Sequence, residues 1–147
     1  MKNPKFIYFT GNPKSIADEA ERLVISQQNF KDGKVYDYTI TDKSWEIIWG
    51  IWVKINPFRS FVWEIWYFID EKYRGQGLTV EAVKILEEIC FNNLKLRRIE
   101  IVMQVKNTAS EKVAIKTWYL KEWLMKNACK NRLDDEPHDA YLYAKTR

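Results

Sequence analysis

One segment in the middle of the chain constrains the fold more than any other. Residues 61–70, FVWEIWYFID, are typical of a β-strand, whereas from Leu78 onward the apolar residues recur at the spacing of a helix. Residues 97–105, RRIEIVMQV, alternate as a strand does. A strand, an amphipathic helix and a second strand in this order predict a right-handed crossover that returns the second strand beside the first. The centre of the protein is therefore expected to be a sheet with a helix packed on it.

The segments before this unit extend the sheet. Residues 35–41 and 45–55 are strand-like, and turn-forming residues separate them from each other and from residues 61–70. This spacing predicts three consecutive antiparallel strands. Nearer the start, residues 6–9 are typical of a short strand, and helical spacing follows over roughly Lys14 to Gln28.

The segments after the unit add a helix and a strand. Thr108 and Glu111 have the spacing of a capping box, which predicts a helix over Ala109 to about Lys116. Residues 140–145, AYLYAK, are typical of a last strand. Because strands and helices are mixed along the chain, the sequence predicts an α/β protein with a mixed, mostly antiparallel sheet flanked by helices.

The composition fits a single folded domain over residues 1–147. The chain is 46% hydrophobic and 15% aromatic, which is too apolar for a disordered chain and enough to bury one core. Its 24 lysines and arginines are interspersed with 20 acidic residues, and neither a basic stripe nor a nucleic-acid-binding motif is present. Direct nucleic-acid binding is therefore not expected. The net charge of +4 favours anionic ligands such as a nucleotide cofactor.

Cysteine, histidine and hydropathy narrow the expected cellular setting. Two cysteines without a CxxC spacing and a single histidine, His138, argue against a zinc site or a disulfide scaffold. We expect His138 at the surface or in a loop. No apolar run approaches the roughly 20 residues of a membrane span, and the first residues have too short an apolar run for a signal peptide. A cytoplasmic protein without a bound metal and away from the membrane fits best.

The loop between the central strand and its helix carries the chemistry. Arg74-Gly75-Gln76-Gly77 opens the helix, where two glycines let the backbone approach a phosphate and the free amides of the first helical turn point at it. Arg74 adds a permanent positive charge. A Gly-x-Gly before a helix is also compatible with a plain tight turn. The third glycine of a dinucleotide fingerprint and the Gly-Lys-Ser/Thr ending of a P-loop are missing, which disfavours nicotinamide and ATP sites.

Together with its neighbours, this loop resembles the signature of the GNAT superfamily of N-acetyltransferases, over roughly Tyr38 to the C-terminus. That signature is Arg or Gln, two residues, Gly, one residue, and Gly or Ala, and Lys72 here departs from its first position. The phrases EIWYFIDEKYRGQGLTVEAVKIL and LRRIEIVMQVKNTASEKVAIK are similar to the RimJ/RimL-like group, which acetylates protein N-terminal amines. The resemblance implies the GNAT fold, acetyl-CoA as cofactor and acyltransferase activity.

The resemblance also implies where coenzyme A binds. The cofactor would lie in a V-shaped gap between the strand that ends at Ile69 and the strand that ends near Val105, with its pyrophosphate on the glycine loop and its pantetheine arm at Asn107. The residues implied in cofactor binding are Phe68, Ile69, Arg74, Gly75, Gln76, Gly77, Leu78, Thr79 and Asn107. Asn107 has an ordinary alternative role, in which it ends the strand and bonds local backbone groups.

Three residues are candidates for catalysis. An ammonium must lose its proton before it attacks a thioester, and a carboxylate can remove that proton through water. Glu64 is the first candidate for this base and Glu71 the second, although either fits a solvated surface carboxylate equally well. The resemblance puts the main-chain amide of Ile69 on the acetyl oxygen. It makes Ser110 the donor of a proton to the departing sulfur, because the position of the tyrosine that many relatives use for this is Ala114 here. Serine is also ordinary in a first helical turn.

Several aromatic residues and one turn bear on the acceptor. Trp45, Trp49, Trp63 and Trp66 are expected in the core or in the walls of an acceptor groove. Where relatives have Lys-x-Gly-Phe, this chain has Trp118 in the glycine position, which puts that turn in question. The expected acceptor is a primary amine, with a protein N-terminus ahead of a small amine, a polyamine or an antibiotic. A coenzyme A-binding module without catalysis is the alternative, and a homodimer is left open.

Overall fold

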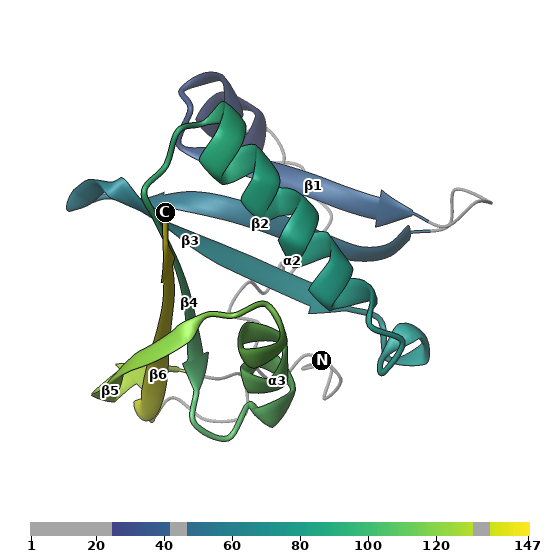
Figure 1. Cartoon of the computed structure of the whole chain (residues 1–147), viewed down its shortest axis with the longest axis vertical. Helices are drawn as coiled ribbons and strands as arrows, with labels where there is room; N and C mark the ends of the chain where they lie inside the picture. The colour runs from purple at the N-terminus through teal and green to yellow at the C-terminus, as the bar shows by residue number, and fades with distance from the viewer. Residues whose placement is uncertain (1–24, 42–46, 131–135) are drawn as a thin grey trace.

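The described strands form one mixed sheet. The computed structural model describes residues 25–41, 47–130 and 136–147. In that part of the chain the sheet order is β1-β2-β3-β4-β6-β5, and every neighbouring pair is antiparallel except β3 and β4 (Figure 1). The strands are β1 Val35–Thr41, β2 Ile47–Asn56, β3 Arg59–Ile69, β4 Arg98–Gln104, β5 Leu120–Cys129 and β6 His138–Thr146. The predicted mixed, mostly antiparallel sheet is confirmed.

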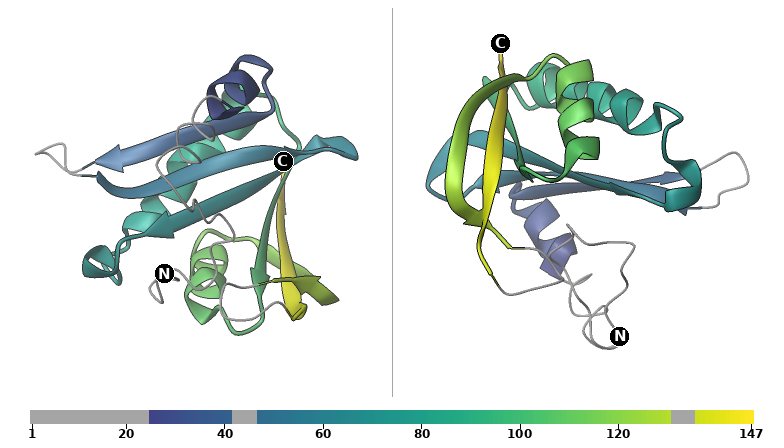
Figure 2. Two further views of the ribbon diagram at one scale, coloured as in Figure 1. Left: turned by 180° about the vertical axis from the view of Figure 1, so that it is seen from behind. Right: turned by 90° about the horizontal axis from the view of Figure 1, so that it is seen from below.

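Helices cover both faces of this sheet. α2 (Leu78–Glu88) and α3 (Thr108–Lys116) lie on one face, and a helix through residues 25–31 lies on the other (Figure 2). α2 continues into a π-helical turn, η3 (Ile89–Asn93), and a short 3₁₀ turn, η2 (Glu71–Tyr73), precedes it. None of the helices in the described ranges combines the length and apolar character that crossing a membrane requires.

Some predictions fall on residues that the structure does not describe. The expected strand at residues 6–9, most of the helix expected from Lys14 and the side chains of Trp45 and Trp49 lie outside the described part. The end of that helix is described, and it continues past the predicted Gln28 into residue 31.

The core lies between α2 and the sheet. α2 forms an amphipathic helix because its apolar residues recur every three or four positions, which puts Ala82, Val83 and Leu86 on one buried face. These side chains pack in one cluster with Trp63 and Ile65 of β3. Alternate residues of β3 therefore face α2, and the residues between them face the opposite side of the sheet.

The central pair of strands separates along its length. β3 and β4 run parallel, as the crossover predicted, but only Val62, Trp63 and Glu64 of β3 have partners on β4. The last of these partners is Glu100, and beyond it the two strands diverge (Figure 1). The backbone groups on that edge of β3 thus lose their ladder partners from residue 65 onward. We call this divergence the fork. Its two arms are the end of β3 on one side and the end of β4 with the segment that follows it on the other.

One strand was missed in the sequence. β5 spans Leu120–Cys129 and pairs with β6 at the edge of the sheet. Its residues are almost all exposed on both faces, and its register is interrupted between Lys121 and Trp123. No alternation of apolar and polar residues marks such a strand, because neither face packs on the core.

Two further expectations need correction. The first residue of α3 is Thr108 rather than Ala109, and its N-cap is Asn107, whose side-chain oxygen accepts a hydrogen bond from the Ser110 amide at 3.2 Å. The capping box predicted on Thr108 is therefore wrong, because Thr108 is already helical. His138 is the first residue of β6 and is half-buried, so it does not lie in a loop.

The turn after α3 keeps a glycine-like backbone without a glycine. Trp118 has φ of +65°, and its amide donates to the Ile115 carbonyl while the Tyr119 amide donates to the Ala114 carbonyl. The helix therefore ends in the left-handed conformation that usually selects glycine. The indole of Trp118 is 80% exposed, so packing recovers little of the strain.

We expect Trp118→Gly to stabilise the protein by about 1 kcal/mol, because the left-handed conformation is strained by roughly that amount for a residue with a Cβ. Trp118→Ala is the matched control, since it removes the exposed ring but keeps the Cβ, and it should leave stability within about 0.5 kcal/mol of the parent. Urea unfolding of the three proteins measures the difference. Equal stability of the glycine and alanine variants would contradict the assigned strain.

Candidate active site

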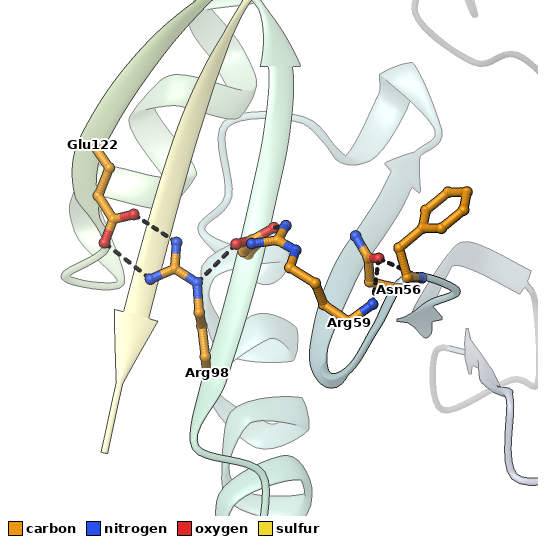
Figure 3. A network of polar contacts seen from close by, with 6 residues as sticks. Asn56, Arg59, Arg98 and Glu122 are labelled. Carbon is orange, nitrogen blue, oxygen red and sulfur yellow. Dashed lines mark hydrogen bonds and ion pairs between the residues drawn. The ribbon is translucent and has the colours of Figure 1, made fainter.

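The closed end of the fork is held by a network of charges. Glu100 of β4 is buried, and its carboxylate accepts hydrogen bonds from Arg59 at 3.0 Å and from Arg98 at 2.7 Å. Arg98 also bonds both oxygens of Glu122 on β5, at 3.0 and 2.5 Å (Figure 3). Asn56 shapes the β2–β3 turn, because its side-chain oxygen accepts from the Arg59 amide. These contacts tie β3, β4 and β5 together where the two central strands still pair.

Glu64 lies at the point where the fork begins. It is half-buried, and it faces away from α2 because its neighbours Trp63 and Ile65 face the core. The pKa of Glu64 is raised to about 7, mainly by burial, and the charge of Glu100 contributes to this rise. The ammonium of Lys54 and the nearby indole N–H of Trp66 oppose that rise in pKa.

Aromatic side chains lie on the same face as Glu64. Trp66 stacks on Trp52 with ring centroids 6.3 Å apart, and Phe68 meets Trp52 edge-on at 6.2 Å. Phe68 also covers Gly50, where an added Cβ would lie 2.7 Å from its ring. The Nε1 atom of Trp66 is buried and forms no hydrogen bond of normal geometry in the described part of the chain. Of the predicted core or groove tryptophans, Trp63 is in the core and Trp66 lies on this opposite face.

The structure does not bring the two carboxylates together. Glu71 is exposed in η2, after the end of β3, whereas Glu64 lies five residues before that end. Five strand residues span roughly 16 Å, so the two side chains lie at different places in the site. Glu64 is at the fork and Glu71 is beside the glycine loop.

The glycine loop is shaped for close approach of a ligand. Asp70 caps η2 by accepting from the Lys72 amide at 3.0 Å, and the Gln76 side chain donates to the Lys72 carbonyl at 3.3 Å. Gly75 and Gly77 then take left-handed backbone conformations, with φ of +78° and +81°. A Cβ built on either would meet nothing within 4 Å, so the space beside both is open.

The loop also leaves the start of α2 available to an anion. Gly77 is the N-cap and has no side chain with which to bond the amides of the first turn, which begins with Leu78 and Thr79. Arg74 lies exposed in the same loop. Open space, helix amides and a cation suit a pyrophosphate, so these residues fit the cofactor that the sequence implied.

Ser110 and Asn107 lie on the other arm of the fork, in and before α3. Ser110 is buried, and its hydroxyl lies 2.7 Å from the hydroxyl of Tyr67, which comes from β3. Burial raises the pKa of Tyr67 to about 12. The oxygen of Asn107 is engaged in capping α3, which is the local role that the sequence left open for it.

Tyr67 is the residue of this site that sequence reasoning missed. Its strand position places it on the α2 side with Ile65, where it packs against the core. Its partner Ser110 is 43 residues away, and no local pattern links them. The available signal was the crossover itself, since it brings the end of β3 near the start of α3.

The remaining titratable residues do not assemble a metal site in the described ranges, where no three His, Cys, Asp or Glu side chains gather suitably. Both thiols are free, with Cys90 buried and Cys129 half-buried. Burial raises the pKa of Cys90 to about 12, so this thiol is protonated near neutral pH.

Curated proteins with similar sequences are acetyltransferases. The chain is 34% identical over 92 residues to the ribosomal-protein-serine acetyltransferase of Escherichia coli, covering 63% of this chain and 50% of that protein. It is 35% identical over 66 residues to the probable N-acetyltransferase YjcK of Bacillus subtilis, covering 45% of this chain and 36% of that protein. The chain therefore spans half the length of these relatives or less.

Solved structures of the same group share the fold. RimL, a ribosomal L7/L12 alpha-N-protein acetyltransferase solved in complex with coenzyme A, superposes with a TM-score of 0.82 at 24% identity, covering 90% of this chain and 73% of that one. RimJ of Mycobacterium smegmatis, in complex with a coenzyme A disulfide, gives 0.83 at 19% identity, covering 97% and 69%.

A family model gives the assignment. The model of the acetyltransferase (GNAT) domain matches residues 1–117. The resemblance drawn from the sequence, including its RimJ/RimL-like direction, is confirmed, and so is the predicted fold class. Acetyl-CoA is the cofactor of this family of acyltransferases. The chain belongs to the GNAT acetyltransferase family.

Proposed function

We propose that this chain is an acetyl-CoA-dependent N-acetyltransferase that acetylates a primary amine, with a protein N-terminal amine as its acceptor. The observation that carries the proposal is the position of Glu64, a carboxylate of pKa about 7 at the start of the fork, on the strand that leads into the glycine loop. The fork and the loop supply a place for a thioester cofactor, and Glu64 supplies a base beside it.

The residues of the loop and the fork would hold the cofactor. The amides from Arg74 to Thr79 would bond the pyrophosphate, Phe68 and Ile69 would line the fork, and Asn107 would lie near the pantetheine arm. When bound, acetyl-CoA supplies the acetyl group as a thioester. The Ile69 amide would donate a hydrogen bond to the oxygen on which negative charge develops.

The two arms of the fork would supply a base and a hydrogen-bond donor. On one arm, Glu64 would accept the proton that the acceptor ammonium loses, directly or through water. On the other arm, the Ser110 hydroxyl would donate toward the departing sulfur. Glu71 is too far along the chain from Glu64 to share its task, and we place it at the edge of the cofactor loop.

A protein N-terminus is favoured as acceptor by the similarity to a ribosomal-protein-serine acetyltransferase. The aromatic row of Trp52, Trp66 and Phe68 beside Glu64 suits the apolar part of a peptide or small amine. We also propose a cytoplasmic location, because the ribosomal proteins acetylated by such enzymes are made there.

Thiol release tests this function. The protein would be incubated with acetyl-CoA and one acceptor at a time. The acceptors are a polyamine, an aminoglycoside and peptides that begin with serine, alanine or methionine. We expect steady thiol release with at least one peptide and little with the other amines. If the protein preferred a polyamine or aminoglycoside, the proposal of a protein N-terminal amine as acceptor would be wrong. Coenzyme A binding without release would leave a binding module.

We expect Gly77→Leu to weaken coenzyme A binding at least about tenfold, or roughly 1.4 kcal/mol, because its side chain would fill the open space beside the loop. Gly33→Leu is the matched control: Gly33 also has a left-handed backbone, with φ of +66°, but lies in the turn before β1. Titration calorimetry should give unchanged affinity for the control. Equal affinity of a folded Gly77→Leu protein would remove the loop from the site.

A further inference from the structure

The Tyr67–Ser110 hydrogen bond joins the two arms of the fork. Tyr67 is on β3, two residues before its end, and Ser110 is in the first turn of α3, shortly after β4. Their hydroxyl oxygens are 2.7 Å apart, and both side chains are largely buried. Among the described residues, the other hydrogen bond of the Tyr67 hydroxyl is a longer one, which it donates to the Ser110 carbonyl at 3.3 Å.

The geometry lets either hydroxyl donate, and the relative acidity of the two groups favours one direction. A phenol is a stronger acid than an aliphatic alcohol, so the Tyr67 hydroxyl is the better donor and the Ser110 oxygen the better acceptor. Ser110 then keeps its own proton for a further acceptor. Donation to Ser110 also polarises its hydroxyl and makes it a stronger donor in turn.

We propose that Tyr67 is a positioning residue that orients the Ser110 hydroxyl toward the departing sulfur and strengthens its hydrogen bond to that atom. This inference rests on the proposed acetyltransferase function. The amine nitrogen forms a bond to the acetyl carbon, and the amine's proton goes to Glu64. As the carbon–sulfur bond breaks, its electron pair stays on sulfur. Ser110 donates a hydrogen bond to the thiolate and keeps its proton, and water later protonates the sulfur.

A hydrogen bond rather than full proton transfer follows from relative acidities. A thiol has a reference pKa near 8.5, far below that of an aliphatic alcohol, so the thiolate does not deprotonate Ser110. Tyr67 stays neutral over the working pH range, since burial raises its pKa to about 12. The pair therefore acts as a fixed donor that does not titrate with the reaction.

The test is a double-mutant cycle of Tyr67→Phe and Ser110→Ala, measured with saturating acetyl-CoA and the best peptide acceptor. We expect Ser110→Ala to lower kcat by about tenfold to a hundredfold and Tyr67→Phe by about tenfold. The double variant should match Ser110→Ala, because Tyr67 acts only through Ser110. Coenzyme A affinity, measured by calorimetry, should change less than about twofold in each variant.

Tyr143→Phe is the matched control for loosening of α3. The Tyr143 hydroxyl donates to Glu111 at 2.7 Å, so this variant removes another tyrosine hydrogen bond from the residue next to Ser110. It should keep kcat within about twofold. A similar loss of kcat in Tyr143→Phe, or multiplicative losses in the double variant, would make Tyr67 merely structural and overturn the proposal.

Failure of this inference is distinguishable from failure of the function. If the parent protein releases no thiol with any acceptor, the proposed function and this inference fall together. If the parent is active and Tyr67→Phe has the same kcat, only the inference falls, and Ser110 acts without help from β3.

Discussion

Glu64→Gln should lower turnover at pH 7 by at least about a hundredfold, equivalent to roughly 2.7 kcal/mol of transition-state stabilisation. The substitution keeps the shape of the side chain and removes its ability to accept a proton. The half-buried position at the fork is also kept, so coenzyme A binding should be nearly unchanged. Steady-state thiol release and calorimetry on the same preparation separate the two effects.

The pH dependence follows from the raised pKa of Glu64. Below about pH 7 the carboxyl holds its proton and cannot act as a base, and above it the charged form accumulates, so kcat/KM should rise through pH 7. In Glu64→Gln that rise is lost. The remaining activity should increase only as the acceptor amine loses its own proton, near pH 8 for an α-amine. The defect should therefore shrink toward pH 9.

Glu71→Gln is the matched control, because it makes the same chemical change in the exposed turn before the glycine loop. Its turnover should stay within about threefold of the parent, with the rise through pH 7 preserved. The reverse pattern, in which only Glu71→Gln loses the rise, would move the base to Glu71. Full activity of both variants would leave proton removal to solvent.

The outline of the fold was accessible from the sequence because it depends on periodicity. The change from alternation to helical spacing at Leu78 predicted the crossover, and the parallel β3–β4 pair confirms it. β5 could not be predicted, because a strand with both faces exposed shows no alternation of buried and exposed residues. The boundary of α3 was misplaced by one residue because Asn107 and Thr108 are both good N-caps, and only the backbone angles decide between them.

The parts of the site that depend on a short stretch of the chain could be predicted from the sequence. The parts that depend on contacts across the fork could not. Gly75 and Gly77 were recognisable because a left-handed loop before a helix selects glycine. The raised pKa of Glu64 needed its burial, and the Tyr67–Ser110 bond needed two segments to meet. The roles of Glu64, Glu71, Ser110 and the cofactor-binding residues stay predictions that the experiments above address.

Arg98, at the closed end of the fork, is expected to affect both the stability of the protein and the pKa of the proposed base, Glu64. Glu100 is Glu64's partner in the β3–β4 register, and it is buried with only 5% of its side chain exposed. Arg98 and Arg59 compensate its charge. Removing Arg98 leaves Glu100 with one cation and leaves Glu122 without its bidentate partner. Both consequences can be measured separately.

Arg98→Met should lower the free energy of unfolding by about 3 kcal/mol, near the lower end expected for breaking a buried pair because Arg59 remains. Lys126→Met is the matched control: its pair with Asp139 is mostly exposed, so the loss should stay below about 1 kcal/mol. Urea unfolding measures both.

With less cationic charge near Glu100, the Glu64 carboxylate is disfavoured and its pKa rises, so the increase of kcat/KM with pH should shift to higher pH. A destabilised Arg98→Met protein with an unshifted profile would show that Glu100 does not act on Glu64, whereas unchanged stability would mean that the network in Figure 3 does not hold the fork closed.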